Sequence, residues 1–225
     1  MGSIQAMANL RHHLKRLNPR GIVLAVILGA LLFFSPQTSW SHTSKDPDGI
    51  SNFASVTDTL YRGAQPSTLG FVTLQHMGVG IIVNFRDEHG EMASEKREVE
   101  SLGMKYVGIP WSGADEPSDA QIVQFLDLVR ANPQTKIFVH CKRGADRTGT
   151  MIAAYRIVVQ HESVSQAVAE MNQYHYSHFW LPQLQSYVIS LPVRLQSDAA
   201  FSAYAPVPAM NPAAAATAAT IVPRP

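Results

Sequence analysis

The segment that most constrains the fold is a short apolar run, Lys136-Ile-Phe-Val-His140, which leads directly into a polar loop and then a helix. A run this short and this apolar is typical of a strand that is buried on both faces of a sheet. Further strand-like runs are expected at 56–61, 80–85 and 104–109, and helices at 69–77, 91–102, 118–129, 151–159 and 164–171. Strands that alternate with helices predict an α/β domain, with a central, mainly parallel sheet of about four strands flanked by helices.

The two ends of the chain differ in composition from its middle. Residues 1–41 contain basic but no acidic side chains, and they include an apolar stretch at 21–34. This layout predicts a secretory signal peptide or an uncleaved N-terminal membrane anchor at 1–41. Either would place the rest of the chain on the extracytoplasmic side of a membrane, the periplasm in a bacterium. We further expect a linker at 42–50, one folded domain at 51–195 and an Ala/Pro-rich disordered tail at 196–225.

Charge and cysteine content exclude several classes of function. Lys and Arg number 18 against 17 Asp and Glu, for a formal net charge of +1. This balance argues against a nucleic-acid partner, because proteins that bind nucleic acids usually carry a clear excess of basic residues. One cysteine excludes a disulfide framework and a cysteine-cluster metal site. Cys141 is therefore either an inert core residue or a nucleophile.

Cys141 opens the loop between the last strand and its helix, and the loop residues suit the binding of an anion. A loop of this type aims backbone N–H groups and a helix N-terminus at one point. Arg147 beside it favours the thiolate form and can hold two phosphoryl oxygens. Gly144 allows a close backbone turn, and Thr148 can donate its hydroxyl to the departing sulfur. The loop thus predicts in-line attack of Cys141 on phosphorus.

The string His140-Cys-(five residues)-Arg147-Thr-Gly resembles the signature of the cysteine-dependent protein tyrosine and dual-specificity phosphatases. Three more strings, at 60–66, 82–88 and 109–112, resemble the small atypical dual-specificity members, and the likeness covers nearly all of 53–190. It implies hydrolysis of phosphate monoesters, phosphotyrosine and also phosphoserine or phosphothreonine, through a phosphocysteine intermediate. It further implies that neither a cofactor nor a metal takes part.

The resemblance also implies a general acid on a mobile loop upstream of the nucleophile. Asp115 is the favoured candidate, followed by Glu116, whereas Asp119 is expected to cap the next helix. The rival is Asp146, directly before Arg147, because bacterial lipid-active relatives have a loop that ends in Asp-Arg-Thr-Gly. The alternative role of Asp146 is to orient Arg147 or to brace the loop.

The residues that would select a substrate leave alternatives open. The phosphate-binding residues are expected to be Lys142, Arg143, Gly144, Ala145, Asp146 and Arg147. The two cations that follow Cys141 make the site basic if they face inward, and are solvated charges if they point outward. Basic loops of this kind resemble those of phosphoinositide and inositol-pyrophosphate phosphatases. An inositol phosphate or lipid is therefore the alternative to a phosphorylated protein, and a non-catalytic phosphate-binding module is a third possibility.

Three supporting features complete the expected site. His140 is expected to tune the thiolate and shape the loop through hydrogen bonds. Arg86, just past a strand end, either contributes to the rim of the site or forms a surface ion pair. The aromatic segment at 174–180 lacks a third metal ligand at suitable spacing and predicts a packed aromatic patch at a helix end.

Overall fold

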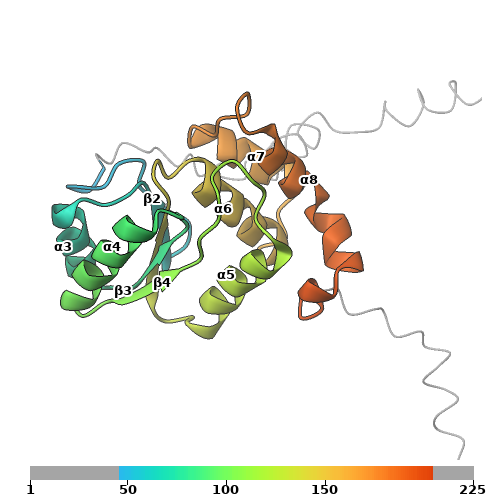
Figure 1. Ribbon diagram of the computed structural model, residues 1–225. Helices are drawn as coiled ribbons and strands as arrows, with labels where there is room; N and C mark the ends of the chain where they lie inside the picture. The colour runs from blue at the N-terminus through green and yellow to red at the C-terminus, as the bar shows by residue number, and fades with distance from the viewer. Residues whose placement is uncertain (1–45, 205–225) are drawn as a thin grey trace, which may run out of the picture. The chain divides into compact units, whose positions relative to one another are not determined.

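The computed structural model describes residues 46–204, so the expected targeting segment and most of the expected tail lie outside the described residues. The described part holds a five-stranded sheet with helices on both faces (Figure 1). The strands are β1 (Ala54–Ser55), β2 (Leu60–Gly63), β3 (Val79–Asn84), β4 (Lys105–Gly108) and β5 (Lys136–His140). The helices are α3 (Thr68–His76), α4 (His89–Ser101), α5 (Asp119–Ala131), α6 (Asp146–Val158), α7 (Val164–Gln173) and α8 (Pro182–Ser197), followed by a 3₁₀ turn η1 (Ala199–Phe201).

The sheet is mainly parallel, which confirms the predicted fold class. Its strand order is β1-β2-β5-β3-β4, and only the two-residue strand β1 runs antiparallel to its neighbour. The strand expected at 56–61 instead forms at 60–63. The intervening residues make a turn in which both Val56 and Thr57 donate backbone hydrogen bonds to the carbonyl of Leu60.

The strand register brings several loops together at one edge of the sheet. Gly63 pairs with His140, and Asn84 pairs with His140 from the other side, so β2, β5 and β3 end at the same level. The N–H of Phe85 then donates to the carbonyl of His140 at 3.0 Å. In parallel sheets ligands bind outside these carboxyl ends. The loops that follow β2, β3 and β5 therefore lie together at this edge, where they can form one site.

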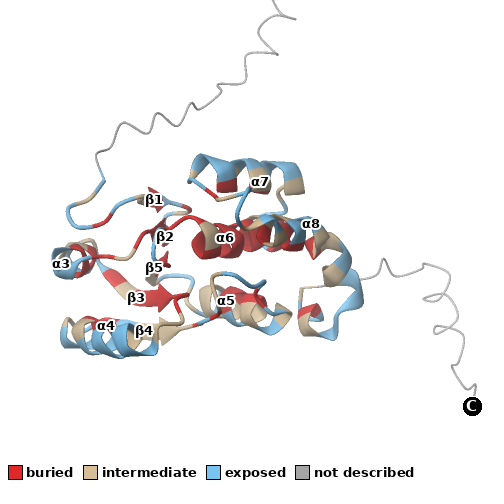
Figure 2. Cartoon of the chain, turned by 45° about the horizontal axis from the view of Figure 1, so that its top comes forward, coloured by how far each residue is buried: buried red, intermediate tan, exposed pale blue. Residues whose placement is uncertain are grey.

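Successive side chains of the central strands point to opposite faces of the sheet, and each face has its own hydrophobic core. Ile137 and Val139 of β5 face a large cluster formed with α5, α6 and α8, whereas Phe138 faces a smaller cluster with residues of α3 and α4. The period of two residues places successive side chains on opposite faces of the sheet. Figure 2 shows α6 buried almost throughout, whereas α4 and α5 have exposed outer sides. The sheet is thereby fixed from both faces.

Helix α6, which follows the loop at Cys141, is the most deeply enclosed element. All of its residues are buried except Asp146 and Arg156, which are half-buried. A helix that is buried all round belongs to the interior of a domain. It also begins at Asp146, five residues before the start expected from the apolar pattern, because its first turn consists of polar residues that belong to the site.

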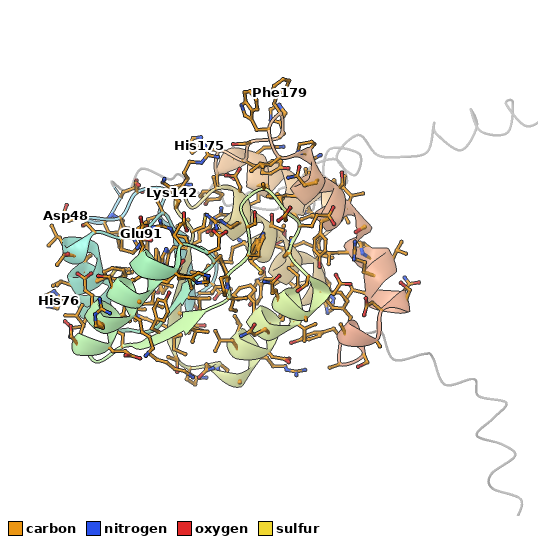
Figure 3. The ribbon with its side chains drawn as sticks, viewed as in Figure 1. Asp48, His76, Glu91, Lys142, His175 and Phe179 are labelled. Carbon is orange, nitrogen blue, oxygen red and sulfur yellow. The ribbon has the colours of Figure 1, made fainter. Side chains whose placement is uncertain are left out.

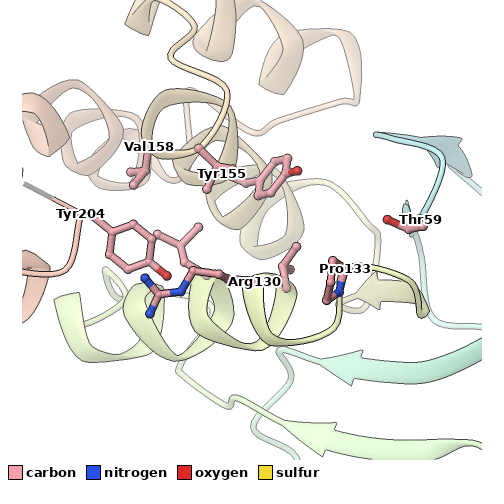
Figure 4. Close-up of a pocket in the computed structure, with 9 residues that line it drawn as sticks. Thr59, Arg130, Pro133, Tyr155, Val158 and Tyr204 are labelled. Carbon is pink, nitrogen blue, oxygen red and sulfur yellow. The ribbon is translucent and has the colours of Figure 1, made fainter. Parts of the chain in front are cut away.

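The packed domain extends past both expected boundaries. Ile50 is 2% exposed, and Phe201 is 0% exposed, although it lies in the region expected to be a tail. Tyr204 lines a cavity of about 400 Å³ with residues of α5 and α6 (Figure 4). The apolar face of α8, together with Phe201, covers α6 and the end of α5, and this packing sets the C-terminal limit beyond 195.

Within residues 46–204 no helix is both long and apolar enough to cross a membrane. The segment at 21–34, on which the export prediction rests, is not among these residues.

Candidate active site

The loop between β5 and α6 holds Cys141 at its base, beneath the edge of the sheet. Cys141 is only 3% exposed and is unpaired. The loop turns through Gly144, which has a φ of +69°. A Cβ atom at Gly144 would lie 2.4 Å from the backbone carbonyl of Gly63. Only glycine therefore satisfies both the left-handed backbone and the close contact with the end of β2.

The backbone of this loop offers unpaired donors. Between Lys142 and Asp146 no backbone N–H group donates a hydrogen bond to another described residue. Helix α6 begins at the end of the loop, and Ala145 at its N-cap supplies no side-chain oxygen. By contrast, Ser118 and Ser163 close the N-termini of α5 and α7 with complete capping boxes. A set of free N–H groups at a helix N-terminus is suited to an anion such as a phosphoryl group.

Arg147 is held in place by one of its three guanidinium nitrogens. Nη1 donates to the carboxylate of Asp87 at 2.8 Å, to the carbonyl of Trp111 at 3.1 Å and to the carbonyl of Phe85 at 3.4 Å. Nε and Nη2 have no hydrogen-bond partner among the described residues. The guanidinium is thus oriented by Nη1, and its Nε–Nη2 edge is available for two oxygens of a ligand.

The acidic loop that carries Asp115 packs against Arg147. A Cβ built on Gly113 would lie 3.5 Å from the Arg147 guanidinium carbon, so this loop runs beside the free edge of the guanidinium. Asp115, two residues further along, is exposed, and its carboxylate has no hydrogen-bond partner among residues 46–204. Its neighbour Ala114 is fixed through its carbonyl, which accepts a hydrogen bond from Gln183 at 2.6 Å. The loop thus carries a free carboxylate two residues from its contact with Arg147.

Asp146 has both carboxylate oxygens engaged on the other side of the loop. Oδ1 accepts the backbone N–H of Ser177 at 2.9 Å, and Oδ2 accepts Nη2 of Arg143 at 2.5 Å. No hydrogen bond joins Asp146 to the guanidinium of Arg147 in the described residues. The geometry therefore assigns Asp146 the bracing role, which ties the loop to the segment after α7.

Asp119 does not cap α5, because Ser118 does. The carboxylate of Asp119 instead accepts the hydroxyl of Tyr187 at 2.6 Å and Nη1 of Arg194 at 3.2 Å. These contacts connect the start of α5 to α8 and stabilise the base of the acidic loop.

A buried network beneath the loop includes a residue that the sequence pattern did not single out. Glu95 of α4 is 6% exposed, and its Oε1 lies 2.9 Å from Nε2 of His140. Its Oε2 accepts hydrogen bonds from Gln65 and Asn84, each at 2.9 Å. Glu95 thereby holds the His140 ring in place through Nε2. The available signal is its position four residues before the buried Val99, which places it on the inward side of α4.

Arg86 extends this network and does not form an open rim. Its guanidinium is buried, donates to Gln65 at 2.8 Å and pairs with Glu88 at 3.1 Å and with Glu91. The hydrogen bond from Arg86 lowers the pKa of Glu88 to about 2. Of the two expected roles for Arg86, the ion pair is the one formed, although the arginine itself is buried.

Arg62, like Arg86, is a buried cation, but the sequence analysis did not single it out. Its Nη2 donates to the carbonyl of Gly144 at 2.9 Å, and its guanidinium stacks 4.0 Å from the ring centroid of Tyr174. Burial lowers its pKa to about 10. Arg62 thus supports the back of the loop from β2.

Thr148 does not make the hydrogen bond that was expected of it. Its hydroxyl is buried without a hydrogen-bond partner, so no bond to the sulfur of Cys141 is formed.

The two cations after Cys141 point outward. Lys142 is exposed, and Arg143 reaches Asp146 and the hydroxyl of Ser177.

The aromatic segment at 174–180 is only partly packed, which corrects the expectation of a packed patch. Tyr176 is buried, but Phe179 and Trp180 are 75% and 76% exposed.

A family model described as "DSP-PTPase phosphatase fused to NAD+ Kinase" matches residues 40–187, more than half of the chain. The chain belongs to this DSP-PTPase family. The signature at His140–Gly149 lies within the matched residues, and the resemblance to the phosphatases is confirmed.

Named relatives agree with this membership. The dual specificity protein phosphatase TpbA of Pseudomonas aeruginosa is 29% identical over 160 residues, which cover 68% of this chain and 71% of TpbA. The crystal structure of a TpbA cysteine-to-serine variant with phosphotyrosine has a TM-score of 0.53 at 23% identity and covers 64% of this chain and 91% of that one. The catalytic domain of the S. cerevisiae PP-IP phosphatase SIW14 has a TM-score of 0.54 at 20% identity, with coverages of 62% and 84%. Both structures share the fold.

Proposed function

We propose that this chain hydrolyses phosphate monoesters by a two-step mechanism with Cys141 as nucleophile. The thiolate attacks phosphorus, the bond to the leaving oxygen breaks, and a phosphocysteine forms. Water then attacks that phosphorus and releases the Cys141 sulfur and inorganic phosphate. The observation that carries the proposal is the free N–H array at residues 142–146 around a buried cysteine, with the free edge of Arg147 beside it.

The loop donors and Arg147 act on the charge of the transferring group. Phosphoryl transfer spreads negative charge over the three equatorial oxygens, and preorganised donors stabilise that charge without reorganisation. Asp87 orients Arg147 through Nη1 and stays outside the covalent step. Asp115 donates the proton to the leaving oxygen, since its carboxylate is free on the loop whose Gly113 lies beside the Arg147 edge, whereas both oxygens of Asp146 are engaged.

Phosphotyrosine is the substrate we propose first, with phosphoserine and phosphothreonine as further substrates. The family and the relative TpbA support a protein substrate. The test is phosphate release by the full chain from phosphotyrosine peptide, phosphothreonine peptide and soluble inositol phosphates, side by side, with Cys141→Ser as the blank. Turnover of the tyrosine peptide is expected to exceed that of the others. Equal release by Cys141→Ser would contradict the mechanism.

An inositol phosphate or phosphoinositide is the second candidate. The exposed Lys142 favours it, because a polyanion carries further phosphates outside the loop for this cation to bind, whereas Arg143 is already paired with Asp146. The likeness in fold to the PP-IP phosphatase SIW14 is consistent with this alternative. The same substrate panel separates the two: a preference for the inositol phosphates that is lost in Lys142→Ala would favour the second candidate.

We also propose that the domain works outside the cytoplasm. The support is the basic stretch followed by the apolar run at 21–34. A fusion of residues 1–50 to an alkaline phosphatase reporter, active only after export, is expected to be active in a bacterial host. An inactive fusion would contradict this location.

A further inference from the structure

Most of the large apolar side chains that the described residues expose come from one stretch of the chain. Six such side chains are exposed, and four of them, Phe179, Trp180, Ile189 and Val193, lie on the α7–α8 connection and on α8. The stretch from Met171 to Ser197 contains no Asp or Glu. Exposed apolar side chains that adjoin one another, as those of Phe179 and Trp180 do, mark a surface that another phase or molecule covers.

Phe179 and Trp180 form the tip of this stretch. Their rings meet edge to face, with centroids 5.1 Å apart. Figure 3 shows Phe179 projecting away from the body of the domain. A projecting tip differs from the concave pocket in which a peptide side chain is bound. Trp is enriched at membrane–water interfaces, where its apolar ring is buried and its N–H stays hydrated.

The base of the tip is fixed to the catalytic loop. The N–H of Ser177 is bound by Asp146, and the hydroxyl of Ser177 by Arg143 at 2.5 Å. On the other side of the tip, Gln183 donates to the carbonyl of Ala114 in the acidic loop at 2.6 Å. The aromatic pair therefore lies between two anchors at the rim of the site. A surface that receives the tip also faces the mouth of the catalytic loop.

The charges around the tip suit a lipid surface with anionic headgroups. Lys142 is exposed beside the Ser177 anchor, whereas the exposed Arg143 is paired with Asp146. The segment at 174–180 that carries the tip contains His175 and His178 but no acid. Asp115 and Glu116 lie past the other anchor and oppose this charge, so the apolar side chains supply most of the attraction.

A second copy of the chain fits the tip less well. Two aromatic side chains bury at most about 150–250 Å² each. A stable protein interface needs about 800 Å² per partner. Eleven residues, 35–45, also separate the expected apolar segment at 21–34 from the first described residue, Asp46. Eleven extended residues span about 40 Å, so an uncleaved anchor would keep the domain within that distance of a bilayer.

We infer that the Phe179–Trp180 tip inserts into the interface of a bilayer and orients the catalytic loop toward its headgroups. The inference rests on the proposed function only for what the loop does there. The docking itself is independent of phosphatase chemistry.

The fluorescence of Trp180 gives a direct test in the full chain, reconstituted into vesicles of phosphatidylcholine and phosphatidylserine. The chain has tryptophans at 40, 111 and 180, and Trp111 is buried. In a Trp40→Phe background, lipids brominated near the headgroup are expected to quench most of the Trp180 emission. The quenched component should be absent after Trp180→Phe. Turnover of a soluble aryl phosphate is expected to be unchanged in both variants, so failure of docking and failure of the proposed function give different results.

Leu69 provides a matched control. It is 56% exposed on α3, which lies at the opposite end of the domain from α8 (Figure 1). The tryptophan introduced by Leu69→Trp, in the Trp40→Phe/Trp180→Phe background, is expected to escape quenching. Equal quenching at both positions, or none at Trp180, overturns the inference. So does shielding of Trp180 from acrylamide by a second copy in lipid-free solution, or by a phosphopeptide but not by vesicles.

Discussion

Asp115 and Asp146 differ in what binds their carboxylates, and this difference leads to a prediction at the residue scale. A general acid matters for a basic leaving group and little for a good one. Asp115→Asn is expected to lower kcat on a phosphotyrosine peptide by about 100-fold or more, and far less on an activated aryl phosphate. Asp146→Asn weakens the brace to Ser177 and Arg143, so it is expected to lower both rates to a similar extent.

A series of aryl phosphates with increasing leaving-group pKa separates the two roles. A steep dependence on leaving-group pKa in Asp146→Asn, together with none in Asp115→Asn, would reverse the assignment.

Glu95 gives the second prediction at this scale. Its carboxylate accepts three hydrogen bonds in a buried site, and Glu95→Ala leaves those donors unsatisfied. We expect the free energy of unfolding to fall by at least about 2 kcal/mol, and kcat/KM to fall because His140 and the loop lose their support. Urea denaturation and steady-state kinetics measure both. Glu98→Ala on the same helix should change stability by less than about 0.5 kcal/mol; an equal loss there would show that the effect is not specific to the network.

The individual site residues divide clearly into those that sequence can and cannot identify. Cys141 and Arg147 stand in one contiguous string, so their common loop was predictable. Asp87 contributes from the loop after β3, Glu95 from α4 and Arg62 from β2, and only the sheet register brings them to that loop. For Arg86 the sequence left a rim position and an ion pair open, and the structure forms the ion pair, with Glu88 and Glu91.

At the scale of elements, Gly144 determines how closely the catalytic loop approaches β2. Gly144→Ala imposes a side chain on a left-handed backbone and forces a Cβ to within 2.4 Å of Gly63. The expected loss of stability is at least about 2 kcal/mol, with loss of activity. Gly78 has a similar φ of +80° but open space around it, so Gly78→Ala should cost about 1 kcal/mol and leave activity intact. Similar midpoints for the two variants in thermal unfolding would contradict this account of the loop.

The elements themselves were largely predictable because hydrophobic periodicity and turn residues mark them. β5 forms at the expected residues 136–140, and α7 starts at the expected Val164. Helix α8 was not expected, since Pro182 and Pro192 interrupt its pattern. Pro182 occupies the first turn, where its missing N–H costs nothing. Packing of the buried Leu184, Val188 and Leu191 against the core outweighs the second proline.

At the scale of the whole molecule, the C-terminal limit of the domain is testable by truncation. A chain that ends at Ser197 loses Phe201 from the core and Tyr204 from the wall of the cavity between α5 and α6. It is expected to lose about 3 kcal/mol of stability or more. A chain that ends at Tyr204 retains these contacts and should match the full chain in chemical denaturation. Equal stability of both truncations would place the limit where the composition alone suggested it, near 195.

The central claim is that one chain of contacts, from the sheet edge to the free N–H groups and Arg147, prepares Cys141 for covalent catalysis. The measurement that tests it most directly is acid-quench trapping of the intermediate from a phosphotyrosine peptide labelled on its phosphate. The label is expected on the peptide fragment that contains Cys141, to be absent in Cys141→Ser, and to turn over equally with and without EDTA. Full hydrolysis by Cys141→Ser, or hydrolysis without any protein-bound label and abolished by EDTA, would contradict the account.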